Sequence, residues 1–281
     1  MLVRQSRFLH YNEGAFVSSG EACLIDPGLL EDEIDTLVAG LGNATPTTIV
    51  LTHSDWDHVL GPEHLPGVHV VAHVAYEEKL DPEGIRVVLG KLEEAAGVER
   101  ALSFEPPRPD RTFDGETVIR VGELELVLEH APGHTADMLT VYEPGSATLW
   151  AADMLSDVEI PLVCDDLEAY ERTLARLVDR EIDVLVPGHG TPSHDRRETK
   201  RRLDEDRRYL DVLRSAVAGA VAGGRSLDEV VAANAEPVIR RSDEDELTHQ
   251  LNVEKAYADL GGDADPRSVG YVRAWREATR R

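Results

Sequence analysis

The sequence predicts an α/β layered domain followed by a helical region. Short apolar runs that end in turn or polar residues are typical of buried strands, and the first three are EACLIDPG (21–28), TTIVLTH (47–53) and GVHVVAHV (67–74). The segment LLEDEIDTLVAGLG (29–42) between the first two carries apolar residues at helical spacing and ends in glycine. A strand–helix–strand unit of this kind favours helices layered on a sheet.

A second set of strands is expected from residue 113 onward. GETVIRVGELELVLEHAPGH (115–134) predicts two strands with a turn at Gly122, and TADMLTVYEPGSATLWAAD (135–153) predicts two more. An amphipathic helix over 166–181 then leads to a last strand in IDVLVPGHG (182–190). The segment 76–112, which joins the two sets, contains the proline-rich FEPPRPDR and is expected to form a connection or a lid.

The sequence changes character after Pro192. Residues 194–224 predict one long charged helix with an apolar stripe, and shorter helices are expected near 226–234, 244–260 and 267–279. We therefore expect a domain of residues 1–195 and a helical C-terminal region of residues 196–281. Within that region, His249 and Asn252 lie three residues apart on one helical face, where they are expected to pin the region onto the domain or, alternatively, to reach a pocket.

Composition limits the classes of partner. A formal net charge of −25 argues against binding to nucleic acid or to an anionic membrane. No apolar run approaches the roughly 20 residues that span a bilayer, and the N-terminal residues lack a signal-peptide pattern, so a cytoplasmic protein is expected. Cys23 and Cys164 are the only cysteines, too few for a disulfide framework. The expected partner is a small-molecule substrate.

Residues of the types that can bind metal ions follow the predicted strands. The stretch LTHSDWDH (51–58) holds four candidate ligands within six positions, and three further strand-ending loops add one candidate each. A glycine precedes each of the two late histidines, which lets the loop turn tightly and aim the ring inward. The candidates are His53, Asp55, Asp57, His58, His134, Asp153 and His189.

These motifs resemble those of the metallo-β-lactamase-fold superfamily of metallohydrolases. The matching runs occur in the expected order over about residues 10–192: LIDPG (24–28), Thr52 to His58, Pro132 to Thr135, Asp153, and Pro187 to Gly190. The resemblance implies a four-layer αββα sandwich with the metals held at one edge. The helical C-terminal region is similar to that of the glyoxalase II-like branch, although no glutathione-binding motif is identified in it.

The resemblance also implies how the ligands divide between two metal ions. His53, the residue at position 55 and His134 would hold one ion, Asp57, His58 and His189 would hold the other, and Asp153 would bridge them. Asp26 and Thr52 are expected to support the ligands from behind. The alternative for Asp26 is that it caps the turn at DPG.

Asp55 departs from the pattern, because the superfamily usually has histidine at this position. Zinc accepts either ligand, whereas added oxygen ligands shift the preference toward manganese or iron. The iron-binding flavodiiron branch has an acidic residue there, usually glutamate, which is one methylene longer. The alternative is a surface carboxylate without a ligand role. We expect two divalent ions, zinc first, with iron or manganese as alternatives.

The expected reaction is hydrolysis of an ester, thioester, lactone or phosphoester of a small molecule. Two divalent ions can share a bridging hydroxide, which Asp57 and Asp153 would hold and orient as the catalytic residues. A second class is an iron-dependent sulfur (persulfide) dioxygenase, which the same fold also hosts. A third is a binding or scaffold protein with a decayed site, although only one ligand position is substituted.

Overall fold

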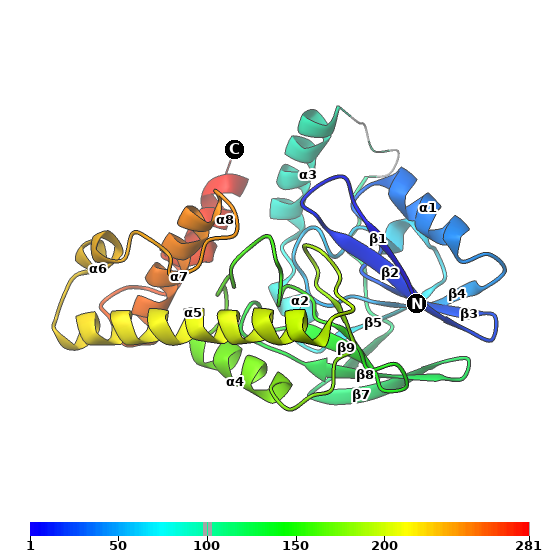
Figure 1. Cartoon of the computed structure of the whole chain (residues 1–281). Helices are drawn as coiled ribbons and strands as arrows, with labels where there is room; N and C mark the ends of the chain where they lie inside the picture. Colours follow the sequence, from blue (N-terminus) through cyan, green and yellow to red (C-terminus); the bar gives the residue numbers. More distant parts are fainter. Residues whose placement is uncertain (98–99, 101–102, 281) are drawn as a thin grey trace.

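The computed structural model describes residues 1–97, 100 and 103–280, and two β-sheets packed face to face form its centre (Figure 1). The first sheet has the order β1-β2-β3-β4-β5-β6, with β1 Leu2–Gln5, β2 Asn12–Ser18, β3 Glu21–Ile25, β4 Thr45–Val50, β5 His69–His73 and β6 Arg111–Phe113. The second has the order β11-β10-β9-β8-β7, with β7 Glu116–Val121, β8 Leu124–His130, β9 Leu139–Glu143, β10 Thr148–Trp150 and β11 Val184–Val186.

Parallel pairing places the chemistry-bearing loops at one edge. Strands β3 to β6 pair in parallel, with Ile25 opposite Val50, so the loops after β3 and β4 begin side by side. In the second sheet β10 and β11 are also parallel, with Trp150 opposite Val186. The carboxyl ends of parallel strands are where α/β folds bind ligands.

The two sheets enclose an apolar layer of buried side chains. The first sheet contributes Phe16, Cys23, Ile25, Val50 and Val71, and the second contributes Ile119, Val121, Leu126, Leu128, Leu139, Val141, Trp150 and Val186. Trp150 is fully buried, and a Cβ atom at Gly14 would lie 2.8 Å from its ring. The inner face of each sheet is therefore close-packed.

Helices cover the outer faces of both sheets. Helices α1 (Glu31–Gly40) and α3 (Pro82–Ala96) pack on the first sheet, with the short α2 (Tyr76–Lys79) and the 3₁₀ turn η1 (Pro62–His64) beside it. Helices α4 (Leu167–Leu177) and α5 (Arg196–Ala222) pack on the second. The layers run helix, sheet, sheet, helix, which confirms the predicted αββα sandwich.

The predicted C-terminal helices are present as α5, α6 (Leu227–Ala233), α7 (Asp245–Asp259) and α8 (Gly270–Thr279). Leu203, Leu210 and Val253 belong to the same apolar cluster as Leu149 of the second sheet. On the last helix of the region, Trp275 of α8 donates its Nε1–H to Asp81, the N-cap of α3, at 2.8 Å. The helical region is thus packed against both halves of the sandwich.

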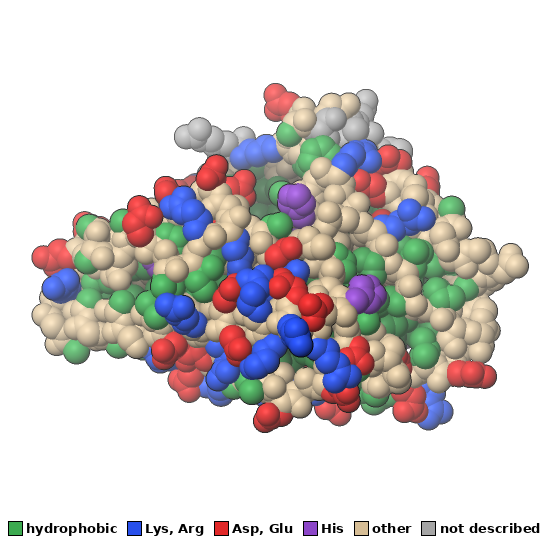
Figure 2. All heavy atoms as spheres, viewed as in Figure 1, with side chains coloured by type: hydrophobic (Ala, Val, Ile, Leu, Met, Phe, Trp, Pro, Cys, Tyr) green, Lys and Arg blue, Asp and Glu red, His purple; other side chains and the backbone are tan. Residues whose placement is uncertain are grey.

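The charged side chains predicted for the long helix lie along α5 and form ion pairs with one another. Arg201 pairs with Glu198 at 2.7 Å and with Glu205 at 2.6 Å, one turn away on either side. In Figure 2, acidic and basic side chains are intermixed over this part of the molecule. Among the residues that the structure describes, none of the helices combines the length and apolar character needed to cross a bilayer.

The segment expected as a connection or a lid is more ordered than its prolines suggest. It contains α2, α3 and β6, and Phe104 in the proline-rich run is buried in the core. Asp81 caps α3 by accepting from Gly84 N at 3.1 Å, and Pro82 occupies the first helical turn. Part of that expectation concerns residues 98, 99, 101 and 102, which lie outside the described residues.

Two valines on β7 test the inner layer. Val121 is fully buried and Val118 is 45% exposed, so the same truncation removes very different contacts. Val121→Ala should lower the free energy of unfolding by about 2–3 kcal/mol, because it loses two buried methyl groups and leaves a small cavity. Val118→Ala should change it by less than about 1 kcal/mol. Chemical denaturation measures both, and equal losses would contradict the assigned faces of β7.

Candidate metal centre

Seven candidate side chains converge at the strand-ending edge. His53, Asp55, Asp57 and His58 follow β4, and the other three come from loops after β8, β10 and β11 of the second sheet. Their ligand atoms form three overlapping groups in which all atoms lie within 4.8 Å of one another. The groups are His53 with Asp55 and His134, Asp57 with His58 and His189, and His53 with His58 and Asp153.

The substituted position belongs to the first group. Asp55 Oδ2 lies 3.2 Å from His134 Nε2 and 3.8 Å from His53 Nε2, and its side chain is only 20% exposed. The carboxylate therefore points at the centre, which the alternative of a solvent-facing loop carboxylate does not explain. Its role as a ligand remains a prediction.

Asp153 lies between the two proposed ligand sets. Its Oδ1 is 3.2 Å from His58 Nε2, and its Oδ2 is 3.4 Å from His134 Nε2 and 3.7 Å from His189 Nε2. In the second set, Asp57 Oδ2 lies 3.1 Å from His189 Nε2 and 3.6 Å from His58 Nε2. This is the placement that a bridging carboxylate requires.

Each histidine is held by its outer nitrogen. His134 Nδ1 is 2.9 Å from the Leu162 carbonyl oxygen and His189 Nδ1 is 2.9 Å from the Leu9 carbonyl oxygen. A carbonyl oxygen can only accept, so both rings carry their proton on Nδ1. The Nε2 lone pairs are then free to face the centre, as metal ligation needs.

Asp26 and Thr52 fix the other two rings. Asp26 accepts from Thr52 N at 2.7 Å and from the Thr52 hydroxyl at 2.6 Å, and its Oδ2 lies 2.9 Å from His58 Nδ1. Because the Thr52 hydroxyl gives its proton to Asp26, its oxygen accepts from His53 Nδ1 at 3.0 Å. Asp26 therefore orients His58 in addition to holding the turn after β3.

The residues fit divalent cations on two further grounds. His53 Nε2, His58 Nε2 and Asp153 Oδ1 are buried, and none of them makes a well-directed hydrogen bond within the described chain, although His58 Nε2 and Asp153 Oδ1 lie 3.2 Å apart. Buried polar atoms without partners are rare and need a specific reason. Imidazole nitrogens and carboxylate oxygens are the usual ligands of zinc, and iron and manganese also use them.

The pKa values show that the cluster requires positive charge. Although burial opposes it, the carboxylates of Asp153 and Asp57 raise the pKa of His189 to about 10. Burial likewise opposes ionisation of Asp153, yet the surrounding histidines, His58 first, hold its pKa well below the usual value. Without metal, protons on the rings would balance the carboxylates, and bound cations would replace those protons.

Glycines allow the loops to approach this closely, for two different reasons. Gly133 has φ of +136° and a Cβ atom there would lie 2.3 Å from Tyr170 Cα. Gly188 has no such backbone requirement, but its Cβ atom would lie 2.3 Å from Asp153 Oδ1. The expectation that both glycines serve a tight turn is therefore correct for Gly133, whereas Gly188 is needed because Asp153 packs against it.

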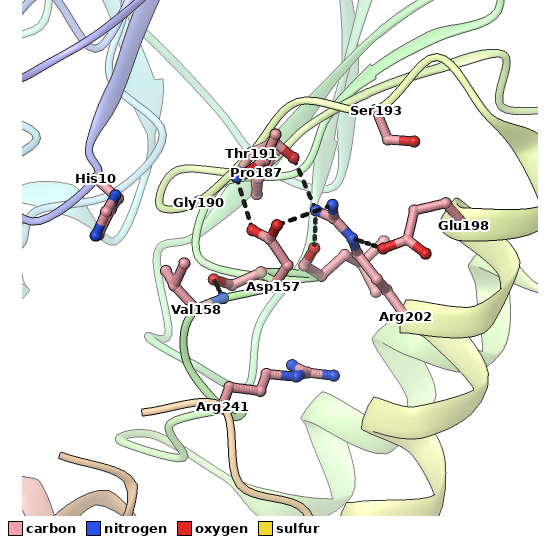
Figure 3. Close-up of polar contacts among 12 residues, drawn as sticks. His10, Asp157, Val158, Pro187, Gly190, Thr191, Ser193, Glu198, Arg202 and Arg241 are labelled. Carbon is pink, nitrogen blue, oxygen red and sulfur yellow. Dashed lines mark hydrogen bonds and ion pairs between the residues drawn. The ribbon is translucent and has the colours of Figure 1, made fainter. Parts of the chain in front are cut away.

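The loop that carries His189 is fixed from α5, through residues that the sequence did not single out (Figure 3). Arg202 is 3% exposed and donates to Glu198 at 2.8 Å and to the Thr191 carbonyl at 2.9 Å. Asp157 lies 3.3 Å from Arg202 Nη2 and accepts from Thr191 N at 2.7 Å. These contacts tie the loops after β10 and β11 to the helical region.

A similar tie supports His134. Asn252 on α7 accepts from Val163 N at 2.7 Å and donates to the Pro161 carbonyl at 2.6 Å. Leu162, between these two residues, supplies the carbonyl that holds His134. His249 contacts the Tyr209 hydroxyl at 2.9 Å instead of entering the centre. The prediction that this helical face pins the region onto the domain is therefore confirmed for Asn252, whereas His249 contacts another helix of the region itself.

The family model of the metallo-beta-lactamase superfamily matches residues 14–189, and the chain belongs to this superfamily. An uncharacterized protein of Aquifex aeolicus is 33% identical over 138 residues, covering 49% of this chain and 61% of that protein. The chain spans 56% to 61% of the lengths of the curated relatives it matches.

Two solved structures show the same fold. The sec-alkylsulfatase Pisa1 from Pseudomonas sp. has a TM-score of 0.71 at 16% identity, covering 90% of this chain and 48% of that chain. A metallo-beta-lactamase family protein from Thermus thermophilus has a TM-score of 0.65 at 20% identity, covering 94% and 95% of the two chains. Members of the superfamily are mostly hydrolytic enzymes that bind divalent metals, which agrees with the convergent histidines and carboxylates.

Asp26→Asn tests the support behind His58. An amide cannot accept from Thr52 N, from the Thr52 hydroxyl and from His58 Nδ1 as the carboxylate does, so His58 should lose its fixed orientation. Affinity for the ion that His58 would help to hold should fall about 10- to 100-fold. Thr52→Ser, which keeps the hydroxyl, is the matched control and should stay near wild type. Competition with a fluorescent zinc chelator measures both, and unchanged affinity in Asp26→Asn would contradict this role.

Proposed function

We propose that the protein is a hydrolase that uses two divalent metal ions to cleave an ester, thioester, lactone or phosphoester of a small molecule. The observation that supports this most is the convergence of four imidazole Nε2 atoms on Asp55, Asp57 and Asp153, with each ring anchored through Nδ1. His53, Asp55 and His134 would hold one ion, and Asp57, His58 and His189 the other, with Asp153 between them.

When bound, two such ions supply a water molecule that ionises near neutral pH and polarise the oxygen of the scissile group. The chain's own groups determine the geometry. Asp57 and Asp153 hold and orient the reacting water, and hydrogen bonds from the Nδ1 atoms keep the four rings from turning. In the net reaction, water adds to the acyl or phosphoryl group, and the leaving oxygen or sulfur takes up a proton.

The side chains around the centre support direct attack by water instead of a covalent intermediate. The Cys164 thiol lies beside the centre, with Sγ 3.9 Å from His134 Nδ1. Burial raises the pKa of the Cys164 thiol to about 11, although His134 lowers it in part. A thiol that stays protonated at neutral pH is a poor nucleophile.

We propose zinc as the first choice of metal, with iron or manganese as the alternatives. Asp55 adds a hard oxygen ligand, which moves the balance toward iron and manganese without excluding zinc.

A second candidate rests on the first ligand group. His53, His134 and Asp55 form a two-histidine, one-carboxylate set, the arrangement typical of non-haem iron oxygenases. This favours an iron-dependent sulfur dioxygenase as the alternative reaction. The close grouping of Asp57, His58 and His189 supports the hydrolase instead, because a mononuclear enzyme has no need for a second complete set.

The proposed hydrolysis is tested by measuring kcat/KM for thioesters, lactones and phosphodiesters before and after chelation. Activity should fall at least about 100-fold without metal and return when zinc, manganese or iron is added, because metal supplies both the acidified water and the polarisation. Equal rates in the chelated protein would contradict the proposal. Oxygen uptake with persulfides by the iron form, without hydrolysis, would favour the dioxygenase.

Substitutions at Asp55 test whether the carboxylate is a ligand. Asp55→His should keep two metals per chain and retain hydrolysis with zinc, while its preference for iron over zinc falls, because nitrogen replaces a hard oxygen. Asp55→Ala should lose one metal and most of the activity. Metal content and kcat/KM measured together decide the point, and two firmly bound metals in Asp55→Ala would show that Asp55 is not a ligand.

A further inference from the structure

A cleft of roughly 630 Å³ opens beside the metal centre. One wall consists of the ligand loops with Trp56, Val158 and Glu159, and the other consists of the helical region, with residues 241–245, Thr248 and Tyr271. The helical region therefore supplies one wall of the cleft that a substrate would contact.

The lining of this cleft is rich in carboxylates. Beyond Asp55, Asp57 and Asp153 of the metal centre, its lining contains Glu159, Asp243, Glu244 and Asp245. All lining residues belong to the described part of the chain, and among them Arg241 is the sole arginine or lysine.

Arg241 is already engaged and cannot serve an anionic substrate. Its guanidinium lies 2.8 Å from Asp206 and 3.2 Å from Glu205, and it donates to the Glu159 carbonyl at 2.9 Å. The side chain is only 7% exposed. A buried arginine with its donors occupied holds the loop before α7 in place. Its guanidinium is therefore not available to bind a substrate in the cleft.

Three carboxylates in the lining remain without a cation. Asp243 and Glu244 are exposed, and no ion pair is recorded for either within the described chain. The Glu159 carboxylate lies 4.0 Å from His189 Nδ1, but that nitrogen is already bonded to the Leu9 carbonyl oxygen. By contrast, Asp245 is buried and accepts from Ser242 N at 2.9 Å and Ile160 N at 3.3 Å.

The balance of charge stays negative even with metals bound. Two divalent ions bring four positive charges, of which Asp55, Asp57 and Asp153 neutralise three, leaving one. Asp243 and Glu244 alone bring two negative charges to the same cleft, which exceeds the one positive charge that remains. An anionic substrate would approach against this field, and a cationic one would approach along it.

Aromatic and apolar surface adjoins these carboxylates. Trp56 and Tyr271 are partly buried in the two walls, near Val158 and Leu162. Burial, and then the neighbouring Asp55, raise the pKa of the Tyr271 phenol well above its usual value, so the ring stays neutral. The faces of aromatic rings attract ammonium groups, and quaternary ammonium ligands bind where such rings and carboxylates lie together.

We propose that the cleft selects substrates that carry an amine or quaternary ammonium group on an apolar chain beside the scissile bond, and that it discriminates against anionic substrates. The inference rests on the proposed hydrolytic function. The ammonium group would lie toward Glu159, Asp243 and Glu244, with its methylene groups against Trp56 and Tyr271.

Three thioesters of matched size test the selection on the metal-loaded full chain. They are butyrylthiocholine, its neutral isostere S-(3,3-dimethylbutyl) thiobutyrate, and the anionic S-(2-carboxyethyl) thiobutyrate. We expect kcat/KM to fall in that order, by about tenfold or more from cation to anion at low salt, with a smaller ratio at high salt. Equal values, or a preference for the anion, would overturn the inference while leaving the hydrolase proposal intact.

Charge variants at the rim give a second, independent test. The double variant Asp243→Asn/Glu244→Gln should lower the ratio of kcat/KM for the cationic thioester to kcat/KM for the anionic thioester. The double variant Asp243→Lys/Glu244→Lys should lower this ratio further or reverse the preference. The control is Asp35→Lys/Glu123→Lys, two exposed carboxylates on α1 and in the β7–β8 turn, which changes the net charge equally. A control that shifts the ratio as much as the rim variant would attribute the effect to overall charge and contradict the inference.

A binding measurement separates this inference from the proposed reaction. If none of the thioesters is hydrolysed, calorimetric titration with hexyltrimethylammonium and with hexanesulfonate still reports on the cleft. Tighter binding of the cation, weakened by the rim substitutions, would support the charge selection although the hydrolase proposal had failed. Tighter binding of the sulfonate would overturn the selection itself.

Discussion

The centre depends on hydrogen bonds that hold four imidazole rings by their outer nitrogens. Two of the acceptors are main-chain carbonyls, at Leu9 and Leu162, and two are side chains, at Asp26 and Thr52. Each bond fixes a tautomer and a ring direction, so every Nε2 atom faces the same small volume. Crowding this many carboxylates and lone pairs together is unfavourable unless cations neutralise them, which is why metal binding underlies the functional proposal.

The fold delivers these acceptors by bringing strand ends together. Parallel pairing of β3 with β4 sets Asp26 beside Thr52, and parallel pairing of β10 with β11 sets Asp153 beside the His189 loop. The helical region completes the arrangement, since Asn252 holds the loop that supplies the Leu162 carbonyl. The same region forms the far wall of the cleft, so it contributes both to the metal centre and to the surface that meets a substrate.

Much of this arrangement could be predicted, because short-range patterns determine it. Alternating apolar runs predict the strands, and polar residues directly after strands predict the ligands. The contacts made by carbonyl oxygens could not be predicted, since Leu9 and Leu162 give no sign in the sequence that their main chain faces a histidine. The roles of Arg202 and Arg241 could not be predicted for a related reason, because a charged segment predicts a solvated surface and not a buried arginine. The sequence around Gly188 predicts only a turn, whereas its contact with Asp153 joins two loops distant in sequence.

The central claim is that the seven converging side chains hold two metal ions. It is tested most directly by elemental mass spectrometry of the full chain, purified without chelator and without a metal-affinity tag. We expect close to two equivalents of zinc, iron or manganese per chain, with the loss of one equivalent in Asp55→Ala. One equivalent or less in the wild-type protein, unchanged after incubation with excess metal, would contradict it.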